Sequence, residues 1–169
     1  LDHLEDLTRQ TYLADARPWV IGYSGGKDST AVVQLIWSAL AKLPSDKRTK
    51  PIYVISGDTL VEAPAIVDRI KKTHRRIMET AAEIGLPFRT QVVRPLLQDT
   101  FWVNLLGKGY PAPYRRFRWC TDRMKIQPAN LFIKTAVEQF GEVVLSLGVR
   151  RAESATRAQS MSLHRRHGE

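Results

Sequence analysis

The sequence predicts a doubly wound α/β fold with a parallel sheet, and three observations carry this prediction. Short apolar runs of strand length alternate with segments in which apolar residues recur at helical spacing. The order over residues 19–93 is strand, helix, strand, helix, strand, which favours parallel pairing and helices on both faces. Gly25 and Gly26 follow the first strand, at the place where Rossmann-like sheets bind their ligands.

Each element follows from local signals in the chain. Residues 1–17 are amphipathic at helical spacing, and the apolar run 19–23 is the first strand. Pro64 suits the first turn of a helix, which Gly85 ends. The other expected elements are a helix over 31–43, a strand over 51–56, a strand over 88–93, a mostly irregular segment over 96–125 with one short helix at 101–106, a helix over 128–140 and a buried strand over 143–147.

Length and composition indicate one water-soluble domain over residues 1–169. A chain of 169 residues buries roughly 70% of its unfolded surface and needs no disulfide or metal to fold. The single cysteine excludes an internal disulfide framework and fits a reducing cytoplasm. No apolar run is long enough to cross a bilayer, so we expect a cytoplasmic protein without a membrane partner. Because the chain begins at Leu1 and has no closing element, we expect a fragment of a longer protein.

Residues 24–29, with the sequence S-G-G-K-D-S, form the candidate phosphate loop. Gly25 and Gly26 let the backbone turn sharply and approach a ligand, and the helix that follows directs its N–H groups and positive dipole end at an anion. Lys27 adds a mobile cation, and Asp28 suits either a divalent cation between carboxylate and phosphate or a helix cap. Hydroxyl groups that can donate to phosphate come from Ser24, Ser29 and Thr30, and Tyr23 precedes the loop.

Two familiar nucleotide loops are excluded by spacing. A Walker A loop needs a glycine where Ile21 stands, and Ser or Thr where Asp28 stands. The G-x-G-x-x-G dinucleotide fingerprint is absent. The remaining alternative is a tight strand-to-helix turn in which Asp28 only caps the helix.

The loop resembles the S-G-G-x-D-S "PP-loop" of the ATP pyrophosphatase superfamily, whose members have an adenine nucleotide α-hydrolase-like fold. The resemblance implies ATP and Mg²⁺ as cofactors and cleavage between the α and β phosphates, with Lys27 and Asp28 as catalytic residues. Two more segments look like those of PAPS reductase-like proteins: D-T…E-x-P from Asp58, and G-x-R-x-x-E-S-x-x-R from Gly148. The second segment would bring Arg150 and Arg157 to the phosphates.

Residues 118–128 resemble the R-W-C-T-x-x-x-K-x-x-P segment of DndC-type sulfurtransferases, which act in DNA phosphorothioation. That resemblance implies a protein whose partners are DNA, a cysteine desulfurase that donates sulfur, and other phosphorothioation subunits. It also implies a 4Fe–4S cluster, with Cys120 as a catalytic thiol or iron ligand. Such a cluster needs about four cysteines, and only Cys120 is present, so the other ligands would lie outside this chain.

The net charge of +9 favours polyanionic partners. Arg115, Arg116 and Arg118 stand among aromatic residues and are the candidate nucleic-acid-binding residues, because arginines grip phosphates while aromatic rings stack on unpaired bases. The basic helix over 64–84 is interpreted as a solvated face. Two other functions stay open: a PAPS reductase-like oxidoreductase, which needs a nucleophilic cysteine near its C-terminus, and a non-catalytic basic module that binds nucleic acid.

Overall fold

A four-stranded parallel sheet forms the centre of the molecule, in the order β3-β2-β1-β4. The computed structural model describes residues 1–150, 159 and 162. The strands are β1 (Trp19–Gly22), β2 (Ile52–Gly57), β3 (Phe88–Val93) and β4 (Val144–Leu147). Since β1 connects to β2 on one side and pairs with β4 on the other, the strand order reverses beside the end of β1. The predicted parallel α/β fold is confirmed.

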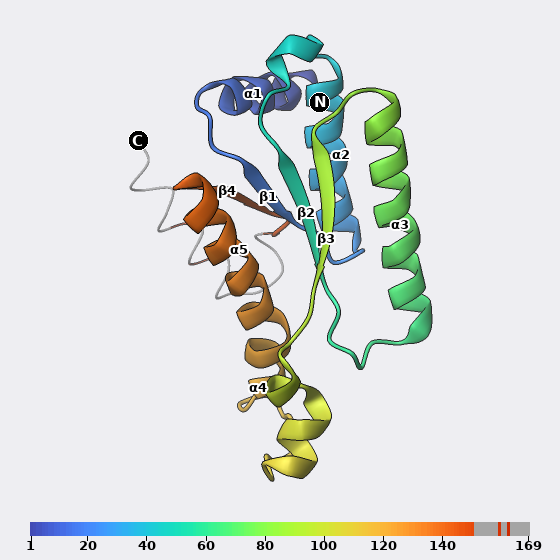
Figure 1. The fold of residues 1–169 in the computed structure, drawn as a ribbon, viewed down its shortest axis with the longest axis vertical. Helices are drawn as coiled ribbons and strands as arrows, with labels where there is room; N and C mark the ends of the chain where they lie inside the picture. Colours follow the sequence, from blue (N-terminus) through green and yellow to red (C-terminus); the bar gives the residue numbers. More distant parts are fainter. Residues whose placement is uncertain (151–158, 160–161, 163–169) are drawn as a thin grey trace.

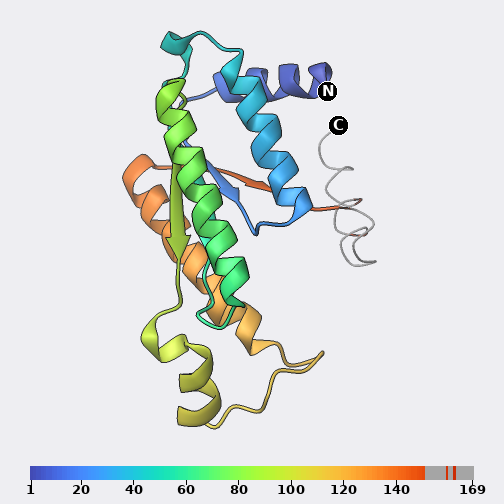
Figure 2. The same ribbon diagram turned by 90° about the vertical axis from the view of Figure 1, so that its right-hand side faces the viewer.

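Helices cover both faces of this sheet (Figures 1 and 2). On one face lie α2 (Lys27–Ala41) and α3 (Pro64–Glu83), and on the other lies α5 (Gln127–Phe140). The N-terminal helix α1 (Asp2–Leu13) packs against α2. Between α2 and the sheet, Ile21, Ala39 and Leu40 are fully buried, which explains why the apolar residues at these positions form the core. The described residues include no helix with the length and apolar content that a membrane crossing requires.

Strand β4 corrects one expectation, since it is an edge strand rather than a fully buried one. Within the described residues it pairs with β1 alone, through a register in which Gly22 lies opposite Leu147. Its side chains alternate between partly buried and exposed, and Leu145 and Leu147 are 46% and 55% exposed. The helix α5 packs on β2 and β3, through contacts such as the one between Tyr53 and Phe132.

The segment between β3 and α5 is more helical than predicted, and it extends beyond the carboxyl ends of the strands (Figure 1). The expected short helix is present, as a helical turn at residues 101–102 that runs into η3 (Val103–Gly107), a π-helix. The further elements are η1 (Ser45–Lys47) and η2 (Leu97–Asp99), both 3-10 turns, α4 (Trp119–Thr121), and η4 (Asp122–Ile126), a second π-helical turn. Because α4, η4 and α5 are continuous, Cys120 lies in the first turn of a helix and not in the expected loop.

A buried histidine packs beside β2, near the residue that follows β1. His74 of α3 is 6% exposed, and its Nε2 lies 2.8 Å from the Oγ of Ser56, which is itself buried in β2. Its ring also packs near Tyr23, with the ring centroids 6.2 Å apart. Burial lowers the pKa of His74 from its usual value of 6.5, because a charged imidazole would lose its hydration there.

We therefore expect stability to fall on mild acidification. Below about pH 6.5 the unfolded chain binds a proton at His74 that the folded chain resists, so the free energy of unfolding decreases as the pH drops toward the lower, folded pKa. His74→Gln removes this group and should give a shallower decrease, measured by urea unfolding across that pH range. His3→Gln, at an exposed position of α1, is the matched control. An unchanged pH slope in His74→Gln would contradict the assignment.

Candidate nucleotide-binding site

The phosphate loop (residues 24–29) connects β1 to α2 at the point where the strand order reverses. The N–H of Tyr23 donates to the carbonyl of Ile55 at 2.8 Å, which fixes the start of the loop against β2. Gly25 has a φ of +75°, a left-handed conformation that favours glycine, and Gly26 is the N-cap of α2. The helix begins at Lys27, so its first free N–H groups and its positive dipole end lie in the loop.

Hydroxyl groups hold the loop in shape. The buried Oγ of Ser29 donates to the carbonyl of Gly26 at 3.0 Å and accepts from the N–H of Ser24 at 3.2 Å. Thr30 donates to the same carbonyl at 2.9 Å. Ser24 is exposed, and its Oγ lies 3.2 Å from that of Ser29. The side chains of Ser29 and Thr30 therefore close the loop through the carbonyl of Gly26, while the side chain of Ser24 stays exposed at its surface.

A charged pair joins the loop to the end of β4. The Nε of Arg150 donates to Oδ2 of Asp28 at 2.9 Å, although the two residues are 122 positions apart in sequence. Gly148 makes this approach possible, because a Cβ there would lie 2.7 Å from the carbonyl carbon and oxygen of Asp28. Lys27, beside them, is exposed. The carboxylate of Asp28, which would repel phosphate, is thus balanced by a cation, and Lys27 adds a second cation that is exposed.

A cleft of about 650 Å³ opens in front of the loop. Its walls come from the ends of β1, β2, β3 and β4, from α3 and from the start of α5. The volume lies within the roughly 300–1,000 Å³ typical of small-molecule sites. Its lining is both apolar and polar. The apolar residues are Ile55, Ile66, Ile70, Ile133, Leu145, Leu147 and Val149. The polar residues are Ser24, Asp28 and Ser29 of the loop, together with Glu62, Lys125 and Asn130. Such a mixture suits a ligand with an apolar ring at one end and an anionic chain at the other.

Comparison with known proteins assigns the family. Residues 18–168 match the phosphoadenosine phosphosulfate reductase domain. The chain belongs to this family. An uncharacterized protein from Methanocaldococcus jannaschii is 30% identical over 158 residues, which make up 93% of this chain and 28% of that protein. The chain therefore spans little more than a quarter of the length of that relative.

A solved structure shares the fold of this PAPS reductase domain. The U34-tRNA thiolase NcsA from Methanococcus maripaludis, solved with its 4Fe–4S cluster, is similar over 99% of this chain and 50% of its own, with a TM-score of 0.52. The sequence identity is 16%, so the similarity concerns the fold. The predicted relation to PAPS reductase-like proteins is confirmed at the level of the family, while the finer relation to DndC-type proteins stays a prediction.

Two residues of this PAPS reductase domain line the cleft although they were not predicted as site residues. Lys125 of η4 and Glu62, which precedes α3, both line it, and Nζ of Lys125 lies 3.4 Å from Oε1 of Glu62. Both residues stand in segments whose resemblance to family motifs was visible in the sequence. Their meeting was not visible, because it depends on how the segment before α5 folds back toward α3.

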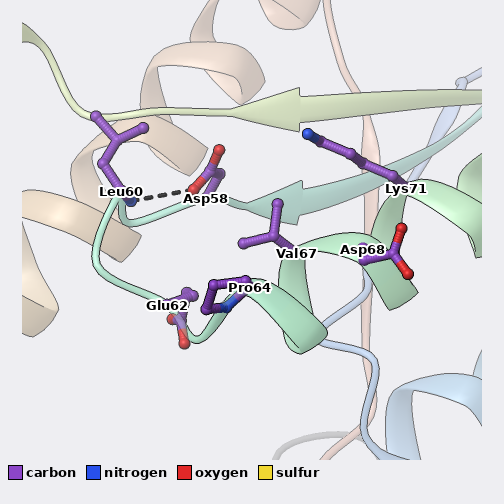
Figure 3. A pocket seen from close by; sticks show the side chains of 7 residues that line it. All are labelled: Asp58, Leu60, Glu62, Pro64, Val67, Asp68 and Lys71. Carbon is purple, nitrogen blue, oxygen red and sulfur yellow. Dashed lines mark hydrogen bonds between the residues drawn. The ribbon is translucent and has the colours of Figure 1, made fainter.

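Asp58 lies outside this cleft, in an adjoining hollow of about 310 Å³ (Figure 3). Its carboxylate accepts hydrogen bonds from the N–H of Leu60 and from Nε of Arg94, both at 3.0 Å. Leu60 has a φ of +63°, which is uncommon for a side chain of this kind. Asp58 therefore holds the turn between β2 and α3, and Glu62 lines both spaces.

Several predicted site residues do not line the cleft, among them Gly25, Lys27, Thr30 and Arg150. Cys120 is partly buried in α4 and is not among the residues that line it. Within the described part of the chain, no group of three or more potential metal ligands is present. Arg115, Arg116 and Arg118 are exposed on the segment that extends beyond the sheet. Arg157 falls outside the described residues.

Proposed function

We propose that this domain binds MgATP in the cleft, cleaves it between the α and β phosphates, and uses the cleavage to incorporate sulfur into the DNA backbone. One observation carries the first part: a glycine loop at the start of a long helix, with Lys27 exposed and Asp28 paired with Arg150, opens onto a cleft of nucleotide size. A helix start of this kind binds phosphate through its N–H groups and dipole. The apolar residues on the wall provide a surface for the adenine ring.

In this proposal the loop stabilises charge that develops on the departing pyrophosphate. The helix N–H groups, Lys27 and the exposed hydroxyl of Ser24 contact the phosphates, and such preorganised donors are the main source of rate in phosphoryl and nucleotidyl transfer. Asp28 is the carboxylate available to the Mg²⁺ that accompanies ATP, since Mg²⁺ is commonly held by one or two carboxylates plus substrate phosphates. Lys125, which lines the same cleft and pairs with Glu62, would add another cation for the nucleotide.

The sulfur part of the proposal concerns Cys120. DNA, a cysteine desulfurase and further modification subunits are the proposed partners, and Cys120 is the thiol that would receive sulfur. A 4Fe–4S cluster does not fit the ligands of this chain by itself, because it needs about four cysteines and the chain has one. No step of the proposal is therefore routed through a cluster.

A second function is favoured by the family itself. A PAPS reductase binds a sulfated nucleotide and reduces its sulfonate, and the phosphate loop and cleft suit that ligand also. The two functions differ in the bond that breaks, which makes them easy to separate by their products.

The test is a product analysis with ATP labelled in its α or γ phosphate. We expect AMP and pyrophosphate in the presence of Mg²⁺. ADP and orthophosphate as the products would refute the proposal, and consumption of PAPS with thioredoxin in place of ATP would favour the reductase. The DNA part is tested separately, by mass spectrometry of nuclease-digested DNA from cells that carry the intact gene or a deletion. Phosphorothioate linkages should disappear with the deletion.

A further inference from the structure

The segment between residues 100 and 121 is cationic throughout. It contains no Asp or Glu, and its four cations are Lys108, Arg115, Arg116 and Arg118. In the described part of the chain, Lys108 alone of these is paired with a carboxylate, that of Asp99 at 3.8 Å. The three arginines are exposed. Unpaired guanidinium groups on an exposed segment favour an anionic partner.

A two-residue hairpin presents two of these arginines. The N–H of Tyr114 donates to the carbonyl of Phe117 at 3.2 Å, and the N–H of Phe117 donates back to the carbonyl of Tyr114 at 2.9 Å. Arg115 and Arg116 therefore stand at the tip of a closed turn. Figure 2 shows this part of the chain extending past the start of α5, at the end of the sheet where the phosphate loop also lies.

Six aromatic rings line the same segment in one continuous series. Neighbouring centroids are 5.2 to 6.4 Å apart in the order Trp102, Phe101, Trp119, Tyr110, Phe117, Tyr114. Trp119 anchors the series, because it is 7% exposed and donates its Nε1 hydrogen to the carbonyl of Pro111 at 3.0 Å. Both ends of the series are open to solvent, with Trp102 and Tyr114 each 58% exposed.

We propose that this surface, defined by Trp102, Tyr114, Phe117 and the three arginines, binds an unpaired nucleic-acid strand. Exposed rings stack on bases of any sequence, and interleaved arginines hold the phosphates between them. A duplex hides the faces of its bases, so it would use the arginines and not the rings. An acidic protein would likewise leave the rings without a role. The inference rests on the proposed function for the identity of the polymer as DNA, and adds that the DNA is bound as a single strand.

The experiment measures fluorescence anisotropy of labelled oligothymidine, alone and as a duplex with oligodeoxyadenosine. We expect tighter binding of the single strand. Tyr114→Ala and Trp102→Ala should each raise its Kd by roughly 5- to 150-fold, the range for loss of one stacked base. Tyr114→Phe keeps the ring and should restore affinity. Changing Arg115, Arg116 and Arg118 together to Gln should reduce the slope of log K against log salt by about 2, at about 0.7 per phosphate.

The matched control changes three exposed cations of α3, Arg69, Lys72 and Arg76, to Gln, and should alter that slope less. Equal affinity for duplex and single strand, an unchanged Kd in both alanine variants, or equal competition by polyglutamate would overturn the inference. ATP cleavage is followed in the same variants without DNA, to separate the two proposals. A variant that loses binding of the single strand but still cleaves ATP would show that this surface acts separately from the ATP site. A wild-type protein that binds the strand as expected and leaves ATP intact would refute the proposed function instead.

Discussion

Asp28→Ala is expected to lower the rate of ATP cleavage by roughly 10²-fold or more. The carboxylate lies in the first turn of α2, 2.9 Å from Nε of Arg150, where the phosphates of a bound nucleotide would meet the helix start. Its removal takes away the proposed ligand of the accompanying Mg²⁺ and leaves Arg150 without its partner. The rate of AMP release at saturating MgATP measures the effect. Ser24→Ala should lower the same rate, because its exposed hydroxyl is the proposed donor to the phosphates.

The loss of rate should come without a large loss of stability. The Asp28–Arg150 pair is partly exposed, with side-chain exposures of 29% and 52%, and exposed ion pairs contribute only about 0–1 kcal/mol to folding. Asp68→Ala is the control, since Asp68 forms an exposed ion pair with Lys72 on α3 and is not among the residues that line the cleft. Normal cleavage by both Asp28→Ala and Ser24→Ala would show that the phosphates bind elsewhere.

Elements with a regular apolar period could be predicted from the sequence because a single face of each is buried. The expected strand over 88–93 agrees with β3, and the expected helix over 128–140 differs from α5 by one residue at its start. The glycine loop was also predictable, since its residue types are local. The predictions that failed were those that depend on which elements pack beside each other. That β4 lies at the sheet edge follows from the strand order, and its apolar run looks the same in a central strand.

The site was predicted in part for the same reason. The loop residues are contiguous, so their chemistry was visible in the sequence. The pair of Lys125 with Glu62 is formed by residues distant in sequence, and no local pattern signals it. The helical path through Cys120 was hidden as well, because a π-helical turn with the charged residues Asp122, Arg123 and Lys125 interrupts the apolar period before α5. Asp58 differs, because its motif was visible in the sequence and predicted a binding residue, whereas in the structure its carboxylate holds a turn of the backbone.

Gly148→Ala should damage the site from outside the phosphate loop. An added Cβ would lie 2.7 Å from the carbonyl carbon and oxygen of Asp28 and 2.8 Å from the nitrogen of Ser29. These are backbone atoms, so no side-chain rotation relieves the contact, and either the end of β4 or the start of α2 must move. Overpacking of this kind costs about 1–3 kcal/mol. If the loop moves, binding must restore its geometry, and the Kd for ATP should rise by roughly 5- to 150-fold.

Gly107→Ala provides the matched control for this substitution. A Cβ at Gly107 would meet only the side chain of Val103, at 3.9 Å, and the residue ends a helical turn far along the chain from the loop. Alanine there should keep or raise stability, because it restricts the unfolded chain without strain in the folded one. Thermal unfolding and an ATP titration measured on both variants compare the two positions directly. Equal changes in stability and in the Kd for ATP would mean that the small size of Gly148 does not set the distance between the end of β4 and the start of α2. The close approach of Arg150 to Asp28 would then need another cause.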